Sequence, residues 1–382
     1  MLYWLLVKSV VVAEEKNVDI SFDECILHSS KRIEENVMSG IYKVGGCVRD
    51  AYMGIEPHDI DYVVVGSSER EMIKAGFDKV GAGFPVFIHP QTHDEYALAR
   101  TEKKTGTGYL GFETYFGPEV TLEQDLHRRD FTMNAMAERH GEICDPYNGR
   151  SDIDNKIIRH VNPDAFAEDP VRILRAARFA ARYDFEISYE TMELISKVEI
   201  TDIEAVPVER VMRELEKALD DGKGYEFLKI ISAMPEIIFD LFFFVNFDSN
   251  FVHIDQVYRE LGMEGVVCLI AEFGGDSQYL ARVKASSDTI FLSRLITLSG
   301  QRHAFDPDDA YELIQRSDFY RRPEFLVKLE KYMAATTLNL ITVANLMAKV
   351  KASDLDPSLK GIQIKHALCE KRRKVFDDYV GL

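Results

Sequence analysis

The chain has 382 residues, a formal net charge of −18 at pH 7 and an apolar share of 46%. Such a composition favours a soluble globular protein of roughly two to four domains. No apolar run reaches the ~20 residues that a membrane-spanning helix needs, so we expect no membrane association. The five cysteines are scattered and form no C-x-x-C pair. This spacing argues against a disulfide framework or a zinc site and favours a reducing compartment, so we expect a cytoplasmic protein.

The acidic balance argues against nucleic-acid binding, but a phosphate backbone responds to local basic patches rather than to the total charge. Basic side chains gather in four runs, at residues 100–104, 127–129, 172–182 and 365–374. Such runs are usually solvated faces, so these need support from neighbouring chemistry before they indicate a nucleic-acid partner.

The first 160 residues divide into two parts. Residues 1–40 carry no interpretable pattern and are set apart as an N-terminal extension of unknown role. Residues 41–160 alternate strand and helix signals, which predicts a small mixed α/β head domain. The expected elements are strands at "YKVGG" and "DIDYVVVG", a hairpin of "PVFIHP" and "EYALAR" around "QTHD", helices across "TLEQDLHRRDFTMNAMAERH", and a strand "GEICDP" closed by the turn "DPYNG".

Strand signals almost vanish after residue 163. "EDPVRILRAARFAARY" predicts a helix with Asp169 at the N-cap and Pro170 at the first helical position. "PVERVMRELEKAL", "YEFLKIISAM" and most of residues 255–380 also have helical periodicity. The predicted fold class is therefore α+β, with a mixed head followed by a helical neck at 161–222 and an all-α body and tail at 223–382.

The stretch "GGCVRDAYMGIEPHDID" carries the first sign of chemistry. Gly45 and Gly46 let the backbone approach a ligand closely, and the following helix offers free N–H groups to a phosphate. Arg49, one turn into that helix, is placed to add a charge-assisted contact. Asp59 and Asp61 are two apart on the predicted strand and face one side, which suits Mg²⁺. The structural alternative is a turn followed by a strand end capped with aspartates.

Five segments in this order identify a family. "GGCVRD…HDIDYVVVG", "RRDFTMNAM", "DPYNG", "EDPVRILRAARFAARYDFEI" and "PVERVMRELEKAL" together resemble the motifs of the bacterial tRNA nucleotidyltransferase (CCA-adding) and poly(A) polymerase family, class II of the nucleotidyltransferase superfamily. The resemblance is strong over about residues 41–220 and faint beyond.

The resemblance implies catalytic roles for the carboxylates and for the glycine turn. Asp59 and Asp61 match the metal-binding pair, so Mg²⁺ is the implied cofactor. Gly46 and Arg49 match positions that contact the incoming nucleotide. Glu95, in "EYALAR", is a candidate third catalytic carboxylate, and its alternative is an exposed strand glutamate.

The segment "DLHRRDFTMNAM" is implied to contact the ribose and triphosphate of the nucleotide. Arg129 suits a phosphate because its planar fork donates two hydrogen bonds, whereas Asp125 and Asn134 suit a ribose hydroxyl. Some of these side chains have structural alternatives, since Asp130 is equally placed to cap the predicted helix "FTMNAM".

The segment "EDPVRILR" is implied to select the base. Asp169 accepts and Arg172 donates, and three residues apart at a helix start they are neighbours able to read a Watson–Crick edge. In the family such a pair selects CTP and ATP without a nucleic-acid template, and Arg175 is expected to touch the nucleotide as well. The helical repeat also predicts one basic stripe, formed by Arg172, Arg175, Arg178 and Arg182.

The remaining segments refine the predicted activity. Residues 100–112 resemble the loop that family members use to change from C to A addition. The chain has no His-Asp dipeptide, so we expect an all-α tail that binds the tRNA acceptor stem without the phosphohydrolase site of some relatives. The predicted function is template-independent addition of CCA to tRNA from CTP and ATP. The alternatives are an A-adding or CC-adding specialist, a poly(A) polymerase, or a catalytically silent tRNA-binding protein.

Overall fold

The computed structural model describes eleven parts of the chain: 37, 40–81, 86–104, 112–164, 169–199, 205–235, 238, 249–273, 278–300, 306–333 and 339–381. They belong to two compact units, each considered by itself. The first unit takes the described residues up to Ala176 and those within 183–199, and the second takes residues 177–182 and the described residues from 205 onward.

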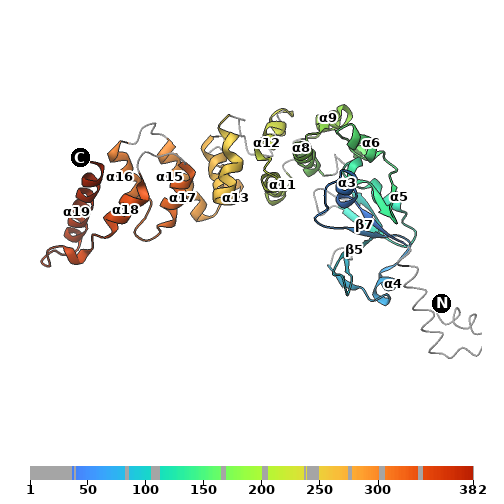
Figure 1. Ribbon diagram of the computed structural model, residues 1–382, viewed down its shortest axis with the longest axis horizontal. Coiled ribbons are helices and arrows are strands. Elements are labelled where there is room, and N and C mark those ends of the chain that lie inside the picture. Colours follow the sequence, from blue (N-terminus) through green and yellow to red (C-terminus); the bar gives the residue numbers. More distant parts are fainter. Residues whose placement is uncertain are drawn as a thin grey trace, which may run out of the picture. The chain divides into compact units, whose positions relative to one another are not determined.

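The first unit is built around a seven-stranded sheet with the strand order β3-β4-β5-β2-β1-β8-β9. Its strand β5 is labelled in Figure 1. The strands of this sheet are β1 (Ile41–Val44), β2 (Tyr62–Val64), β3 (Asp78–Val80), β4 (Val86–Ile88), β5 (Glu95–Leu98), β8 (Ala137–Arg139) and β9 (Glu142–Cys144). β2 and β5 are parallel and the other neighbours in this sheet are antiparallel. Two smaller sheets pair β6 (Arg100–Lys104) with β7 (Phe112–Phe116) and β10 (Ile157–Ile158) with β11 (Glu186–Ile187).

The predicted hairpin around "QTHD" is confirmed, because β4 and β5 pair antiparallel across it. The predicted strands "YKVGG" and "GEICDP" are also present, as β1 and β9. The parallel pairing of β5 with β2 joins strands that are distant in sequence, and no local pattern announces it.

The helices of the first unit are short apart from one. They are α3 (Gly46–Tyr52), α4 (Glu69–Lys74), α5 (Leu122–His127), α6 (Gly149–Asp154), α8 (Val171–Tyr183), which ends in this unit, and α9 (Tyr189–Ile195), together with the 3-10 turn η1 (Thr132–Asn134). The helix predicted from "EDPVRILRAARFAARY" is confirmed as α8.

The prediction of helices throughout 121–140 is wrong in its second half. After α5 the chain makes only the η1 turn and then enters strand β8. Met133, Ala135 and Met136 are each 0% exposed because this segment runs through the interior. Its apolar residues therefore do not mark one face of a helix, and pairing of β8 with β1 decides its conformation.

The sheet is covered on both faces. Val63 and Val64 are consecutive in β2 and therefore point to opposite faces. Val63 belongs to an apolar cluster with Leu126 and Ala137, and Val64 to another with Met72 and Phe87. Val37, within the predicted N-terminal extension, is buried in the second of these clusters.

The described part of the second unit contains helices joined by turns and no strand, as predicted for the tail. Its helices are α11 (Val208–Asp220), α12 (Gly224–Ser232), α13 (Ile254–Phe273), α14 (Tyr279–Arg282), α15 (Ser287–Gly300), α16 (Pro307–Arg316), α17 (Glu324–Met333), α18 (Leu340–Ala348) and α19 (Ile362–Val380), with 3-10 turns η3 (Ser249–His253) and η4 (Ala352–Asp354). An apolar cluster holds α15 to α19 together (orange to red in Figure 1). In the described part of the chain, no helix combines the length and the apolar character needed to cross a membrane.

Candidate active site

The glycine turn between β1 and α3 is closely approached by an arginine side chain. Gly45 has φ +76°, a left-handed conformation that favours glycine. A Cβ atom at this position would lie 2.7 Å from Nη1 of Arg129. The guanidinium of Arg129 therefore lies directly against the turn, and a Cβ at Gly45 would displace it.

Arg129 is held from one side only. Its Nη2 donates to Oδ2 of Asp125 at 3.2 Å, whereas its Nε is buried and has no hydrogen-bond partner among the described residues. A buried donor without a partner is costly and rare in folded proteins. Nη1 of the Arg129 guanidinium thus lies beside a glycine turn, and the planar fork of a guanidinium suits a phosphate.

Asp59 and Asp61 precede strand β2 rather than lying within it, which corrects the predicted strand start. The backbone N–H of Val44 donates to the carbonyl of Asp61 at 3.0 Å, so Asp61 lies beside the end of β1, next to the glycine turn. The side chain of Asp59 is 94% exposed, with its Oδ1 3.6 Å from Nδ1 of His58. Neither carboxylate pairs with a lysine or arginine in the described part of the chain.

The predicted third carboxylate, Glu95, lies at the exposed start of β5. Tyr62 pairs with Tyr96 in the parallel register, which places Glu95 beside Asp61 one residue earlier. The described residues nevertheless contain no group of three or more His, Cys, Asp or Glu side chains that could hold a metal ion. The roles of Asp59 and Asp61 as metal ligands and of Glu95 as a third carboxylate therefore stay predictions.

A buried chain of polar contacts runs behind the glycine turn and is centred on Asp130. The Nε of Arg175 donates to Oδ2 of Asp130 at 2.7 Å, and Nδ2 of Asn134 donates to its Oδ1 at 2.9 Å. The amide oxygen of Asn134 in turn accepts from Nη1 of Arg49 at 2.6 Å. Three residues predicted to contact the nucleotide are thus tied together through one carboxylate.

The charges around Asp130 keep it ionised. Burial raises the pKa of its carboxyl, but the positive charge of Arg175, the hydrogen bond from Asn134 and the charge of Arg172 outweigh burial and hold the pKa well below its usual range. Asp125 behaves alike, because Arg128 and Arg129 lower the pKa of its carboxyl more than burial raises it.

Asp130→Asn is expected to destabilise the protein by about 1.5–3 kcal/mol, because it removes the charge from the buried carboxylate that accepts hydrogen bonds from Arg175 and Asn134. A carboxyl with a depressed folded-state pKa stabilises the fold above its unfolded pKa of about 3.9, and this contribution is lost as the pH falls further. Urea unfolding at pH 7 and near pH 3 measures both effects. We expect the difference in the free energy of unfolding between the variant and the unsubstituted protein to be smaller at the lower pH. The control is Glu193→Gln, in an exposed pair with Lys197. A loss no larger than that of the control would contradict the assigned role.

The start of α8 contacts the segment that carries Arg129. Oδ1 of Asp169 accepts from the backbone N–H of Val171 at 3.3 Å, which makes it a helix cap as predicted. The Nη2 of Arg172 donates to the carbonyl of Arg128 at 2.9 Å, and its Nη1 donates to the carbonyl of Arg129 at 3.4 Å. Since Arg129 touches Gly45, a continuous set of contacts within the first unit connects Arg172 to the glycine turn.

The predicted basic stripe along α8 is not an exposed cationic surface. Arg178 is 5% exposed and its Nε donates to Oε2 of Glu214 at 2.6 Å, within the second unit. Arg182 pairs with Asp221 at 3.5 Å in the same unit. The spacing of the arginines was apparent in the sequence. Their acidic partners lie outside α8, and the helical repeat of α8 cannot predict them.

The segment resembling the C-to-A loop is described only at its stem, the β6–β7 pair, since residues 105–111 lie outside the described residues. The stem is fixed at its base: Nη1 of Arg128 donates to Oε1 of Glu102 at 3.2 Å, and the backbone N–H of Arg100 donates to Asp125 at 3.2 Å. The stem therefore contacts the same segment that carries Arg129.

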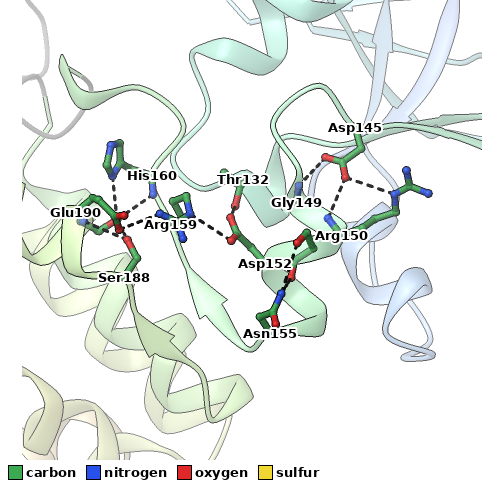
Figure 2. A network of polar contacts seen from close by, with 12 residues as sticks. Thr132, Asp145, Gly149, Arg150, Asp152, Asn155, Arg159, His160, Ser188 and Glu190 are labelled. Carbon is green, nitrogen blue, oxygen red and sulfur yellow. Dashed lines mark hydrogen bonds and ion pairs between the residues drawn. The ribbon is translucent and has the colours of Figure 1, made fainter.

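A polar network that was not predicted from the sequence joins η1 to neighbouring elements (Figure 2). Oγ1 of Thr132 donates to Oδ2 of Asp152 at 2.7 Å, and Nε of Arg159 donates to the other oxygen of Asp152 at 3.2 Å. Nη1 of Arg159 also donates to Glu190 at 2.9 Å. These contacts tie η1, and with it Asn134, to α6 and α9.

The motif "DPYNG" serves this packing. A Cβ at Gly149 would lie 2.3 Å from the carbonyl oxygen of Thr132, so only glycine allows α6 to approach η1. Asp145 accepts from the backbone N–H groups of Gly149 at 2.6 Å and Arg150 at 3.0 Å, which caps α6 (Figure 2). This motif is therefore structural in the described residues.

Comparisons with known proteins define the class and then the family. Residues 41–159 match the family described as the poly A polymerase head domain, which makes this part of the chain a nucleotidyltransferase head. A curated relative named CCA-adding enzyme, from Pseudomonas putida (strain W619), is 42% identical over 302 residues, which cover 74% of this chain and 80% of that protein. The chain belongs to the CCA-adding enzyme family.

Solved structures agree on the fold. The Bacillus stearothermophilus CCA-adding enzyme in complex with CTP is 22% identical, with a TM-score of 0.61 over 91% of this chain and 92% of that chain. A CCA-adding enzyme in complex with ATP is 21% identical, with a TM-score of 0.62 over 93% of this chain and 95% of that chain.

Proposed function

We propose that this protein adds C, C and A to the 3′ end of tRNA from CTP and ATP, releasing pyrophosphate, in the cytoplasm and without a nucleic-acid template. The observation that carries the proposal is the guanidinium of Arg129, which lies against the Gly45 turn with its Nε unpartnered. In a chain of the CCA-adding enzyme family, this is where the phosphates of an incoming nucleotide would bind.

Asp59 and Asp61 are the residues that would hold Mg²⁺. They supply hard oxygen ligands, and no lysine or arginine of the described residues neutralises them, which fits a divalent cation. Bound Mg²⁺ would neutralise negative charge on the phosphates during transfer. The part left to the protein would be to place the 3′-hydroxyl in line with the α-phosphate.

Nucleotide selection falls to the start of α8. Asp169 and Arg172 offer an acceptor and donors to the edge of a base, and the contacts of Arg172 with the carbonyls of 128 and 129 hold its guanidinium in place. The triphosphate would lie between Gly46 and Arg129, with Arg49 behind the turn. Asp125, Asn134 and Arg175 act in this proposal by orienting these groups.

The tRNA partner would be held at its acceptor stem through phosphates and shape, because double-stranded RNA hides its base edges. Much of the basic run in α19 is already engaged: Arg373 pairs with Asp308 at 2.5 Å and with Asp377 at 2.7 Å. Binding should weaken with rising salt, as counterion release requires.

Incubation with tRNA lacking its 3′ end and with labelled CTP, ATP or both tests the proposal. We expect two cytidines and a single terminal adenosine. A long adenosine tail would indicate a poly(A) polymerase, and addition of only C or only A would indicate a specialist. Binding of tRNA without any incorporation would indicate a silent binder. Each of these three results contradicts the proposal.

A further inference from the structure

The last residue of α8, Tyr183, contacts Arg49 in two ways. The Oη of Tyr183 donates to Oδ1 of Asp50 at 3.0 Å. This Oδ1 of Asp50 also accepts from Nε and from Nη2 of Arg49, each at 2.8 Å. The guanidinium carbon of Arg49 also lies 4.9 Å from the centre of the Tyr183 ring, within cation–π range. Tyr183 therefore acts on Arg49 directly and through Asp50.

The guanidinium of Arg49, held in this way, is buried next to the glycine turn. Arg49 and Asp50 are only 5% and 8% exposed. A Cβ at Gly46 would lie 3.4 Å from Nη2 of Arg49, so this nitrogen is in contact distance of the turn. With Asn134 on Nη1 and Asp50 on Nε and Nη2, every nitrogen of the guanidinium has a fixed direction.

The hydroxyl of Tyr183 restrains the carboxylate on which this geometry depends. The terminal torsion of an aspartate is broad, so a carboxylate that bonds only a flexible arginine can rotate together with it. A phenol from a different helix gives Oδ1 of Asp50 a fixed external partner. Without that partner, Asp50 can rotate, and Nε and Nη2 of Arg49 lose the fixed acceptor that directs them beside Gly46, while Nη1 still donates to Asn134.

We propose that Tyr183 is a positioning residue for the triphosphate part of the nucleotide site, acting through Asp50 and Arg49. This inference rests on the proposed function, in which the triphosphate lies at the Gly45–Gly46 turn. Because CTP and ATP share that triphosphate, the effect of Tyr183 is the same for both nucleotides.

The position of Tyr183 on α8 supports an effect on nucleotide binding that does not depend on the base. Arg172 is in the first turn of this helix and Tyr183 is its last residue. At 1.5 Å per residue the two are about 16 Å apart along the axis. The helix thus carries its base-reading residue at one end and its phosphate-positioning residue at the other.

Two variants separate the contacts of Tyr183. Tyr183→Phe keeps the ring and removes the hydrogen bond to Asp50, and Tyr183→Leu removes both. The matched control is Tyr258→Phe, which deletes a tyrosine–aspartate hydrogen bond of 2.6 Å to Asp220 in the second unit. For each protein we would measure the thermal midpoint, the Kd of CTP and of ATP by calorimetry in magnesium buffer, and KM and kcat for incorporation.

Tyr183→Phe is expected to raise Kd and KM about fivefold for CTP and ATP alike, since one hydrogen bond to a charged group is lost. Its thermal midpoint should match that of the control, and the control should leave both Kd values unchanged. Tyr183→Leu should raise Kd further, and the phenylalanine variant alone decides if the leucine variant does not fold. Unchanged nucleotide affinity in Tyr183→Phe, or a change for only one nucleotide, would overturn the inference.

The unsubstituted protein keeps this test separate from that of the proposed function. If it binds CTP and ATP but incorporates neither, the proposed activity fails while the affinities still decide the role of Tyr183. If it binds neither nucleotide, both proposals are wrong.

Discussion

Asp59→Ala is expected to lower kcat for incorporation by about 10³-fold or more while leaving the fold intact. The reason for the loss is that this carboxylate is one of two proposed ligands of the ion that balances charge at the phosphates. The reason for the intact fold is its 94% exposed side chain, whose described contact is an exposed histidine. Removal of such a side chain usually changes stability by less than about 0.5 kcal/mol.

The control for this variant is Asp78→Ala, which removes an exposed aspartate from edge strand β3. Single-turnover incorporation at saturating nucleotide, together with a thermal melt, measures both effects. Full activity of Asp59→Ala would contradict the proposal that Asp59 binds the catalytic Mg²⁺. An equal loss in Asp78→Ala would show that the effect is not specific to the pair of carboxylates.

Arg172→Ala is expected to reduce discrimination between nucleotides by about ten- to a hundredfold, measured as the ratio of kcat/KM for the correct and the incorrect nucleotide at each step. A site that hydrogen-bonds a base loses selectivity when its donor is removed. tRNA binding should remain nearly unchanged, because the guanidinium contacts the carbonyls of residues 128 and 129 inside the first unit.

Arg172→Lys is the companion variant, since it keeps the charge but loses the planar fork. It should lose discrimination as well, while a role in charge alone predicts that it is nearly normal. Filter binding of tRNA run in parallel completes the test. Equal losses of tRNA binding and incorporation in Arg172→Ala would contradict the template role.

The parts of the site that could be predicted from the sequence are those whose structure depends on residues close to them in the chain. The turn at Gly45 and Gly46 follows from a strand, two glycines and a helix start, all within a few residues. The cap at Asp169 likewise depends on its immediate neighbours, and α8 begins at Val171, one residue after the Pro170 that was predicted to start it. Family membership was equally accessible, because it rests on short segments in a fixed order.

The parts that the sequence did not predict depend on contacts between distant segments. Nothing near Arg175 announces that Asp130 will neutralise it, and nothing near Tyr183 announces Asp50. The same limitation explains the wrong helix at "FTMNAM", where burial on all sides imitates a helical pattern. It also explains the basic stripe, because Glu214, the partner of Arg178, lies on a different helix.

A crystal structure of the protein with CTP and Mg²⁺ would show whether the glycine turn and the start of α8 bind one nucleotide. We expect the triphosphate against the Gly45–Gly46 turn and Arg129, Mg²⁺ on Asp59 and Asp61, and the cytosine edge within hydrogen-bond distance of Asp169 and Arg172. A nucleotide bound with its phosphates at the turn and its base directed away from Asp169 and Arg172, or bound elsewhere altogether, would contradict this expectation.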